Sequence, residues 1–170
     1  QASLLNNIGV FYQFLGQYEE SVLAFEKGLL SARNSKNLRM DSLISIGLGD
    51  VYAELEDFEM AKQNYYHAKE IIETIEDRFL QHALIFSQAN TAFLQKDSVL
   101  AHQFIDSIKD TVLAGGSNYE TGLLALICGR LSLLDKHFDK SVEELSHAEK
   151  YFADGSRSVE ANIARIWLTA

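Results

Sequence analysis

Proline is absent from this chain of 170 residues, although average usage would supply about eight. Because proline marks turns and breaks helix interiors, its absence favours helices joined by short polar turns. The single cysteine excludes an intrachain disulfide and a zinc site built from clustered thiols. Basic residues are also scarce, with 15 Lys and Arg against 24 Asp and Glu and a net charge of −9. Since nucleic-acid surfaces depend on clustered basic side chains, we expect no direct nucleic-acid contact.

Long apolar runs are missing as well. The longest is Leu123–Cys128, which is far too short to span a bilayer. No basic segment followed by an apolar core opens the chain, so we expect no signal peptide. The expected location is the cytoplasm, without membrane contact. Because the sequence begins with Gln1, we also expect it to be a segment of a longer protein.

An internal repeat of 40 residues organises the chain. A large residue recurs without gaps at Phe25, Tyr65, Ile105 and Leu145, and four positions earlier stand the small residues Ser21, Ala61, Ala101 and Ser141. Twelve positions before those, small residues recur at Gly9, Gly49, Ala89 and Gly129. Residues four apart share one face of a helix. The pattern therefore predicts four helical hairpins, in which the small residue of the first helix lets the backbone of its partner approach closely.

Polar turns separate the two helices of each hairpin at the same spacing, namely Gly16-Gln17, Glu56-Asp57, Lys96-Asp97 and Lys136-His137. Asp57 and Asp97 are suited to cap the following helices. The segment from Ser117 to Glu120 predicts a capping box between two hairpins. Asp154-Gly155-Ser156 predicts a similar joint near the end of the chain. A last helix is predicted from about Ser158. With no segment alternating at period two, the fold class is all-α with roughly nine helices.

The first copy, through Leu5, Gly9, Tyr12, Ser21 and Phe25, resembles the tetratricopeptide repeat. The second copy matches through Leu48-Gly49, Tyr52, Ala61, Tyr65 and Ala68. The resemblance implies an α-α superhelix, a solenoid of about four helical hairpins plus a further helix, in one array over residues 1–170. The predicted units are 2–41, 42–81, 82–121 and 122–161, with the start of a fifth at 162–170.

Two features depart from the usual repeat: the period is 40 where 34 is common, and no copy closes with proline. Long copies of this kind resemble those of large bacterial transcriptional regulators of the maltose-activator, LuxR and SARP types. Kinesin light chains and spindle-orientation scaffolds also use repeats near this length.

Residues that could carry chemistry are sparse. His67 and His147 occupy the same position two repeats apart, so we expect them not to converge on one metal ion. Gly115-Gly116-Ser117 lacks the lysine and the strand of a phosphate-binding loop. Cys128 falls at an inter-helix packing position, where a small buried hydrophobic residue is typical. We therefore expect no enzyme, no metal and no cofactor.

The first helices of tetratricopeptide arrays line a concave groove. The residue after the small one supplies a column of polar side chains on that face: Asp50, Asn90 and Arg130. Further groove candidates on the first helices are Asn6, Phe86, Phe93 and Leu126. Two interpretations remain open: the polar column holds the backbone of a partner peptide, or it is a structural network between neighbouring helices. The apolar candidates likewise either contact a partner or pack against the next helix.

The resemblance implies a protein–protein interaction scaffold that binds a partner peptide or helix in its groove. The alternative is an effector-sensing or autoinhibitory arm of a bacterial transcriptional regulator. A further expectation is self-association through the apolar C-terminal end face, which carries Ile163, Ile166, Trp167 and Leu168.

Overall fold

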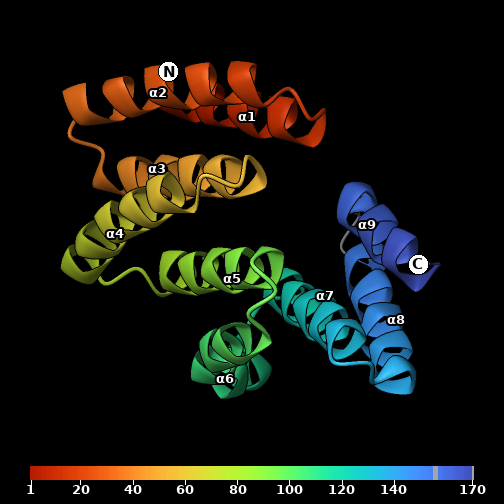
Figure 1. Cartoon of the computed structure of the whole chain (residues 1–170). Coiled ribbons are helices and arrows are strands. Elements are labelled where there is room, and N and C mark those ends of the chain that lie inside the picture. Colours follow the sequence, from red (N-terminus) through yellow and green to blue (C-terminus); the bar gives the residue numbers. More distant parts are fainter. Residues whose placement is uncertain (155–156, 170) are drawn as a thin grey trace. The chain divides into compact units, whose positions relative to one another are not determined.

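The computed structural model describes residues 1–154 and 157–169, and within them it forms nine helices and no strand. They are α1 (Ala2–Phe14), α2 (Tyr18–Asn34), α3 (Leu38–Glu54), α4 (Phe58–Ile75), α5 (Arg78–Leu94), α6 (Ser98–Gly115), α7 (Asn118–Leu134), α8 (Phe138–Asp154) and α9 (Ser158–Leu168) (Figure 1). The predicted all-α fold of four hairpins and a further helix is confirmed. The predicted joint residues Gly155 and Ser156 lie outside the described residues.

The hairpins are α1–α2, α3–α4, α5–α6 and α7–α8, and α9 follows them. Their first helices begin at Leu38, Asn118 and equivalent positions, so the predicted unit boundaries at 42, 82, 122 and 162 fall inside first helices. The reason is physical: the small and large columns lie in the middle of helices and define the period, whereas capping residues define where each helix begins.

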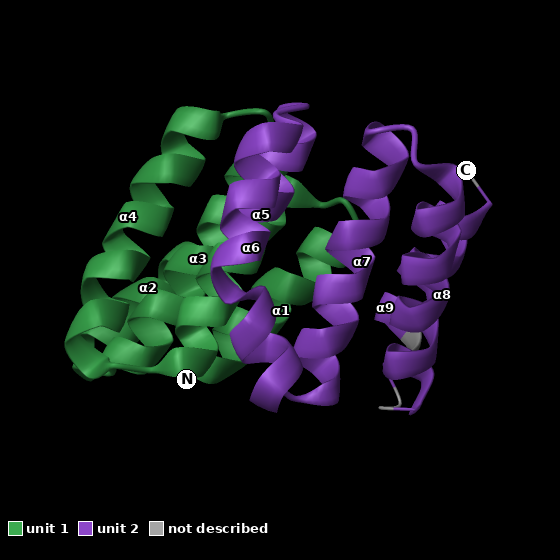
Figure 2. Cartoon of the chain, turned by 90° about the horizontal axis from the view of Figure 1, so that it is seen from below, with its two compact units in different colours: residues 1–87 green, residues 88–170 purple. Residues whose placement is uncertain are grey.

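The chain divides into two compact units, residues 1–87 and residues 88–170 (Figure 2). Unit 1 holds α1 to α4 and most of α5. Unit 2 holds the last residues of α5 together with α6 to α9. That residues 1–170 form a single array stays a prediction.

The large residue of a second helix packs against a glycine of a first helix. The fully buried ring of Phe25 on α2 lies between Gly9 on α1 and Gly47 on α3, where an added Cβ would come within 2.7 Å of the ring. The ring of Tyr65 occupies the same place beside Gly49. In unit 2, Leu145 and Phe152 of α8 pack against Gly129 and Gly122 of α7. The small residue thus admits a large side chain, and not simply a partner backbone as the sequence predicted.

Serine in the small column of the second helix adds a hydrogen bond. Ser21 donates its hydroxyl to the carbonyl of Gly9, and Ser141 donates to the carbonyl of Gly129, both at 2.8 Å. Both serines are buried, where an unpaired hydroxyl would be costly. In the first hairpin and in the fourth, this hydrogen bond links the two helices of the hairpin to each other.

From Gly16 to Lys96 a left-handed turn occurs every 20 residues, twice as often as the sequence columns; Gly116 breaks the series with φ −71°. Left-handed backbone occurs at Gly16, Lys36, Glu56, Glu76, Lys96 and Lys136. At five of these turns the next N–H bonds a carbonyl five residues back, as Asp57 does to Tyr52 at 2.9 Å. This is a Schellman closure, which satisfies carbonyls left open at a helix end.

The residue after the left-handed position starts the next helix. The Asp57 and Asp97 side chains accept from the N–H groups of Met60 and Leu100, which confirms both predicted caps. Asn37 caps α3 in the same way. Ser117 and Glu120 form the predicted capping box of α7, with both reciprocal hydrogen bonds present. Because the left-handed residue that ends one helix is followed directly by the residue that caps the next, the connection between the two helices is short.

We expect Gly49→Ala to destabilise unit 1 by about 2 kcal/mol, because overlap with the buried Tyr65 ring outweighs the better helix propensity of alanine. The matched control is Gly115→Ala, where nothing lies within 4 Å of the added Cβ; it should be neutral or slightly stabilising. Urea unfolding of the two variants measures the difference. Equal stabilities would contradict the packing described.

We expect Lys96→Gly to stabilise the protein by up to about 1 kcal/mol, because glycine relieves the strain of left-handed backbone at φ 60°. Lys109→Gly in the interior of α6 is the control and should cost about 1 kcal/mol. Thermal and urea unfolding compare the pair. A loss of stability in both variants would show that the strain at Lys96 is negligible.

Candidate functional site

Within unit 2, the end of α5 together with α7 and α9 places one arginine against two aromatic rings. Arg130 of α7 donates from Nη1 to Oδ1 of Asn90 on α5 at 2.6 Å. Its guanidinium carbon lies 4.1 Å from the centroid of the Phe93 ring and 4.8 Å from that of the Trp167 ring on α9. The two rings meet edge to face, with centroids 5.8 Å apart. We call Asn90, Phe93, Arg130 and Trp167 the arginine cluster.

The repeat explains why these residues meet. Asn90 and Arg130 stand 40 residues apart, at the same place on successive first helices. Phe93 lies one turn after Asn90 on α5 and therefore on the same side of that helix. Trp167 occupies on α9 the position that Ile127 has on α7. All four side chains are partly buried, so the cluster reaches the surface.

The arginine cluster holds the guanidinium of Arg130 in one orientation. A guanidinium within about 6 Å of an aromatic face gains roughly 0.5–2 kcal/mol per ring, more where water is excluded. The hydrogen bond to Asn90 sets the rotation of the guanidinium plane between the rings. An arginine held in this way loses little further side-chain entropy when it binds a carboxylate or a carbonyl oxygen.

Asp50 lies in a separate network within unit 1. Its carboxylate accepts from Tyr65 Oη at 2.8 Å and from Ser87 Oγ at 3.1 Å, which links α3, α4 and α5. Burial raises the pKa of Asp50 to about 6; the two hydrogen bonds oppose the rise, and the nearby charge of Glu54 adds to it. The hydroxyl of Tyr65 thus serves Asp50 while its ring fills the space beside Gly49.

The structure distributes the predicted groove residues over three environments. Asn90, Phe93 and Arg130 come together, while Asp50 pairs with Tyr65 and Ser87. Phe86 and Leu126 are core residues, exposed by only 4% and 6%, and Leu126 packs with Leu145 and Phe152. Asn6 on α1 is partly buried, and its amide lies 3.5 Å from Asn7.

Sequence reasoning missed Trp167 and the hydroxyl of Tyr65. Trp167 was assigned to the apolar end face, although the 40-residue spacing from Ile127 on the groove face of α7 would have placed it beside Arg130. The spacing also placed Tyr65 in the core, where its ring does lie. No periodicity could reveal that its hydroxyl reaches the carboxylate of Asp50, because that depends on the tilt between two helices.

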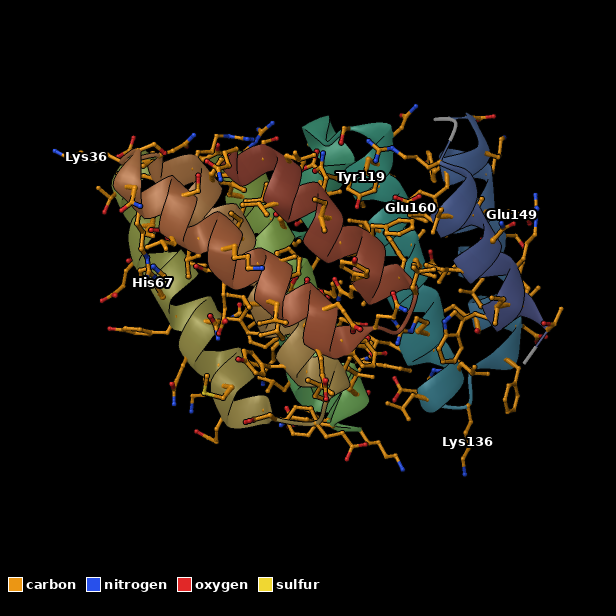
Figure 3. The ribbon with its side chains drawn as sticks, turned by 90° about the horizontal axis from the view of Figure 1, so that it is seen from above. Lys36, His67, Tyr119, Lys136, Glu149 and Glu160 are labelled. Atoms are coloured by element: carbon orange, nitrogen blue, oxygen red, sulfur yellow. The ribbon has the colours of Figure 1, made fainter. Side chains whose placement is uncertain are left out.

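Two further polar clusters connect helices without forming a catalytic arrangement. Asp41 of α3 accepts from Arg33 Nε at 3.2 Å, and His67 Nε2 on α4 lies 2.9 Å from its other oxygen. Figure 3 labels His67 and, at the nearby turn between α2 and α3, Lys36. Asp41 is almost fully buried. Its two hydrogen bonds hold α4 beside the C-terminal end of α2.

In unit 2, Ser98 Oγ and His102 Nε2 both bond Asp135, at 2.6 and 2.9 Å. These bonds hold the pKa of Asp135 below its usual value. The hydroxyl donates to the carboxylate and not to the imidazole, which differs from the nucleophile–base–acid order of a catalytic triad. The cluster instead ties the start of α6 to the turn after α7.

The lone cysteine, Cys128, lies on α7 and is partly buried. Burial raises the pKa of the Cys128 thiol to about 11, with Glu144 adding to the effect, so this thiol stays protonated at neutral pH. In the described part of the chain, no three His, Cys, Asp or Glu side chains are placed to hold a metal ion. Over those same residues, no helix has both the length and the apolar composition needed to cross a membrane.

The first two hairpins carry a recognisable family pattern. Residues 1–74 match the family model of the tetratricopeptide repeat. The match covers α1, α2, α3 and nearly all of α4. Together with the repeated hairpins, it supports a tetratricopeptide repeat array. No curated protein matches the sequence.

The raised pKa of Asp50 predicts a pH dependence of stability. The unfolded carboxyl ionises near pH 3.8 and the folded one near pH 6, so the stability present at low pH is lost as the pH rises from about 4 to about 6. The loss is at most about 3 kcal/mol. Asp50→Asn should abolish this loss, leaving the variant similar to the wild type at pH 4 and more stable at pH 7.

Urea unfolding between pH 4 and 8 measures this effect, with the exposed Asp106→Asn as the control for general charge effects. The difference between wild type and Asp50→Asn should grow with pH, whereas the control difference should stay nearly constant. Parallel curves for all three proteins would contradict the assignment to Asp50.

Proposed function

We propose that the chain is a protein-interaction module that holds a partner segment at the arginine cluster of unit 2. Tetratricopeptide repeats generally mediate protein–protein interaction, and the match over residues 1–74 brings this chain under that expectation. The observation that carries the proposal is Arg130, fixed by Asn90 and flanked by Phe93 and Trp167.

The composition of the cluster supports this assignment. Trp, Tyr and Arg are enriched among the few residues that dominate binding energy at protein interfaces. Arg130 and Trp167 lie on successive first helices, and all members of the cluster are partly exposed. A guanidinium that is already oriented suits a carboxylate or a backbone carbonyl of a partner. The partner segment would therefore present such an oxygen together with an apolar side chain for the rims of the two rings.

Arg130→Ala is expected to reduce partner capture at least tenfold, because it removes the oriented cation from between the rings. Proteins that bind the full chain are recovered by affinity capture from the source cells and quantified by mass spectrometry. Arg130→Lys should also weaken capture, since lysine keeps the charge but not the planar fork that matches a carboxylate.

The matched control is Arg165→Ala on α9, which removes an arginine bonded to Glu149 and Asn162. It should leave capture unchanged, and circular dichroism should show all three variants folded. Capture that survives Arg130→Ala would remove the cluster from the binding surface. A thermal shift with small metabolites that depends on Arg130, without any protein partner, would instead favour an effector-sensing arm.

A further inference from the structure

The outward side of α2 differs from that of every other second helix. Leu23 and Leu30 stand on it two turns apart, with 54% and 63% of their surface exposed. The equivalent positions of the other second helices are polar: Gln63 and Glu70, Gln103 and Asp110, and Glu143 and Lys150. Those side chains are also exposed. Stacking of hairpins therefore leaves this stripe in solvent, and the leucines of α2 are not explained by the repeat.

The charges of α2 are segregated along its length. Glu19 and Glu20 lie in its first turn, whereas Arg33 lies in its last turn and Lys36 at the turn that follows. In α4 and α8, acidic and basic residues alternate along the helix. If a second copy of α2 packed antiparallel to the first, each acidic end would therefore lie beside a basic end. Interaction between the two helix dipoles also favours the antiparallel arrangement.

The leucines fit the same arrangement. In an antiparallel pair with a two-fold axis midway between Leu23 and Leu30, each Leu23 faces Leu30 of the partner subunit. The same register sets Glu19, which lies on the Arg33 side of the leucines, nearly level with Arg33 of the partner subunit. Arg33 also bonds Asp41, but half of its side-chain surface remains exposed. Leu30 also forms one wall of a surface groove of about 540 Å³ beside α1, whose other lining residues include Leu5, Lys27 and Asn34. That groove offers space for an apolar side chain from the second copy.

We propose that the outward stripe of α2 is a self-association surface, on which two copies of this chain pair their α2 helices antiparallel about a two-fold axis. The occupant is a second copy because the stripe is complementary to itself, both in its paired leucines and in its separated charges. The interface is isologous, so it closes as a dimer and does not propagate into a fibre. It is distinct from the C-terminal end face expected from the sequence.

The experiment replaces the two leucines by the residues that α4 carries at the same positions, in the variant Leu23→Gln/Leu30→Glu. Sedimentation equilibrium of the full chain should show a monomer–dimer equilibrium for the wild type and at least a tenfold higher dissociation constant for the variant. The control is Leu113→Gln on α6, an equally exposed leucine, which should leave the equilibrium unchanged. Because all three positions are exposed, the helical signal and melting should stay as in the wild type.

A cross-linking test checks the register, in a Cys128→Ala background. Oxidation of a mixture of Leu23→Cys and Leu30→Cys copies should give covalent dimer faster than either variant alone, because position 23 faces position 30. Wild-type protein that stays monomeric, which would leave the stripe to another protein, overturns the proposal. So does a dimer unaffected by the leucine variant, or cross-linking fastest within the Leu23→Cys variant alone. Arg130→Ala should leave the dimer intact, which separates this result from that of the proposed function.

Discussion

The packing of a large second-helix side chain into the space beside a first-helix glycine sets the geometry of the hairpins. Phe25 meets Gly9 in its own hairpin and Gly47 in the next one, so one buried ring both closes a hairpin and fixes its neighbour. Phe152 does the same in unit 2, where it packs on Gly122 and shares a core with Ala161 and Ala164 of α9. Protein interiors are close-packed, so a contact of this kind leaves little freedom in the angle between helices.

That constraint decides which polar residues can meet. Because the ring of Tyr65 packs against Gly49, its hydroxyl reaches the carboxylate of Asp50, the next residue on α3. Arg130 likewise follows Gly129, whose space is filled by Leu145. The residue after the glycine therefore points beside the packed contact, toward the neighbouring first helix. At Asp50 this position holds a carboxylate that accepts hydrogen bonds from Tyr65 and Ser87. At Arg130 it holds a guanidinium that contacts two aromatic rings.

The sequence was sufficient for the hairpins and for most helix starts, which depend on repetition and on local capping. The small and large columns predicted the hairpins, and Asp57, Asp97 and the Ser117–Glu120 box marked helix starts correctly because capping is local. Four of the six left-handed positions lie in turns that the 40-residue spacing predicted, but their left-handed backbone was not foreseen, since five of the six residues are Lys or Glu and not glycine. Three of the four members of the arginine cluster were predicted for the groove: Asn90 and Arg130 from the polar column, and Phe93 as a further candidate on the same helix as Asn90. Trp167 was missed because the repeat was not extended from Ile127 to α9, although its ring lies over the guanidinium.

A repeat supplies its own internal comparison, and this separates two kinds of exposed apolar residue. Leu4 and Phe11 are 64% and 60% exposed on α1, yet the same columns on α3 hold Ile44 and Val51, which are fully buried in a core that includes Phe25 and Ala32 of α2. Their exposure thus follows from their place in the first hairpin and identifies no partner. Leu23 and Leu30 belong to columns that remain in solvent in every other hairpin. Stacking does not account for leucine at these two positions, and this is why the self-association surface is proposed on α2 and not on α1.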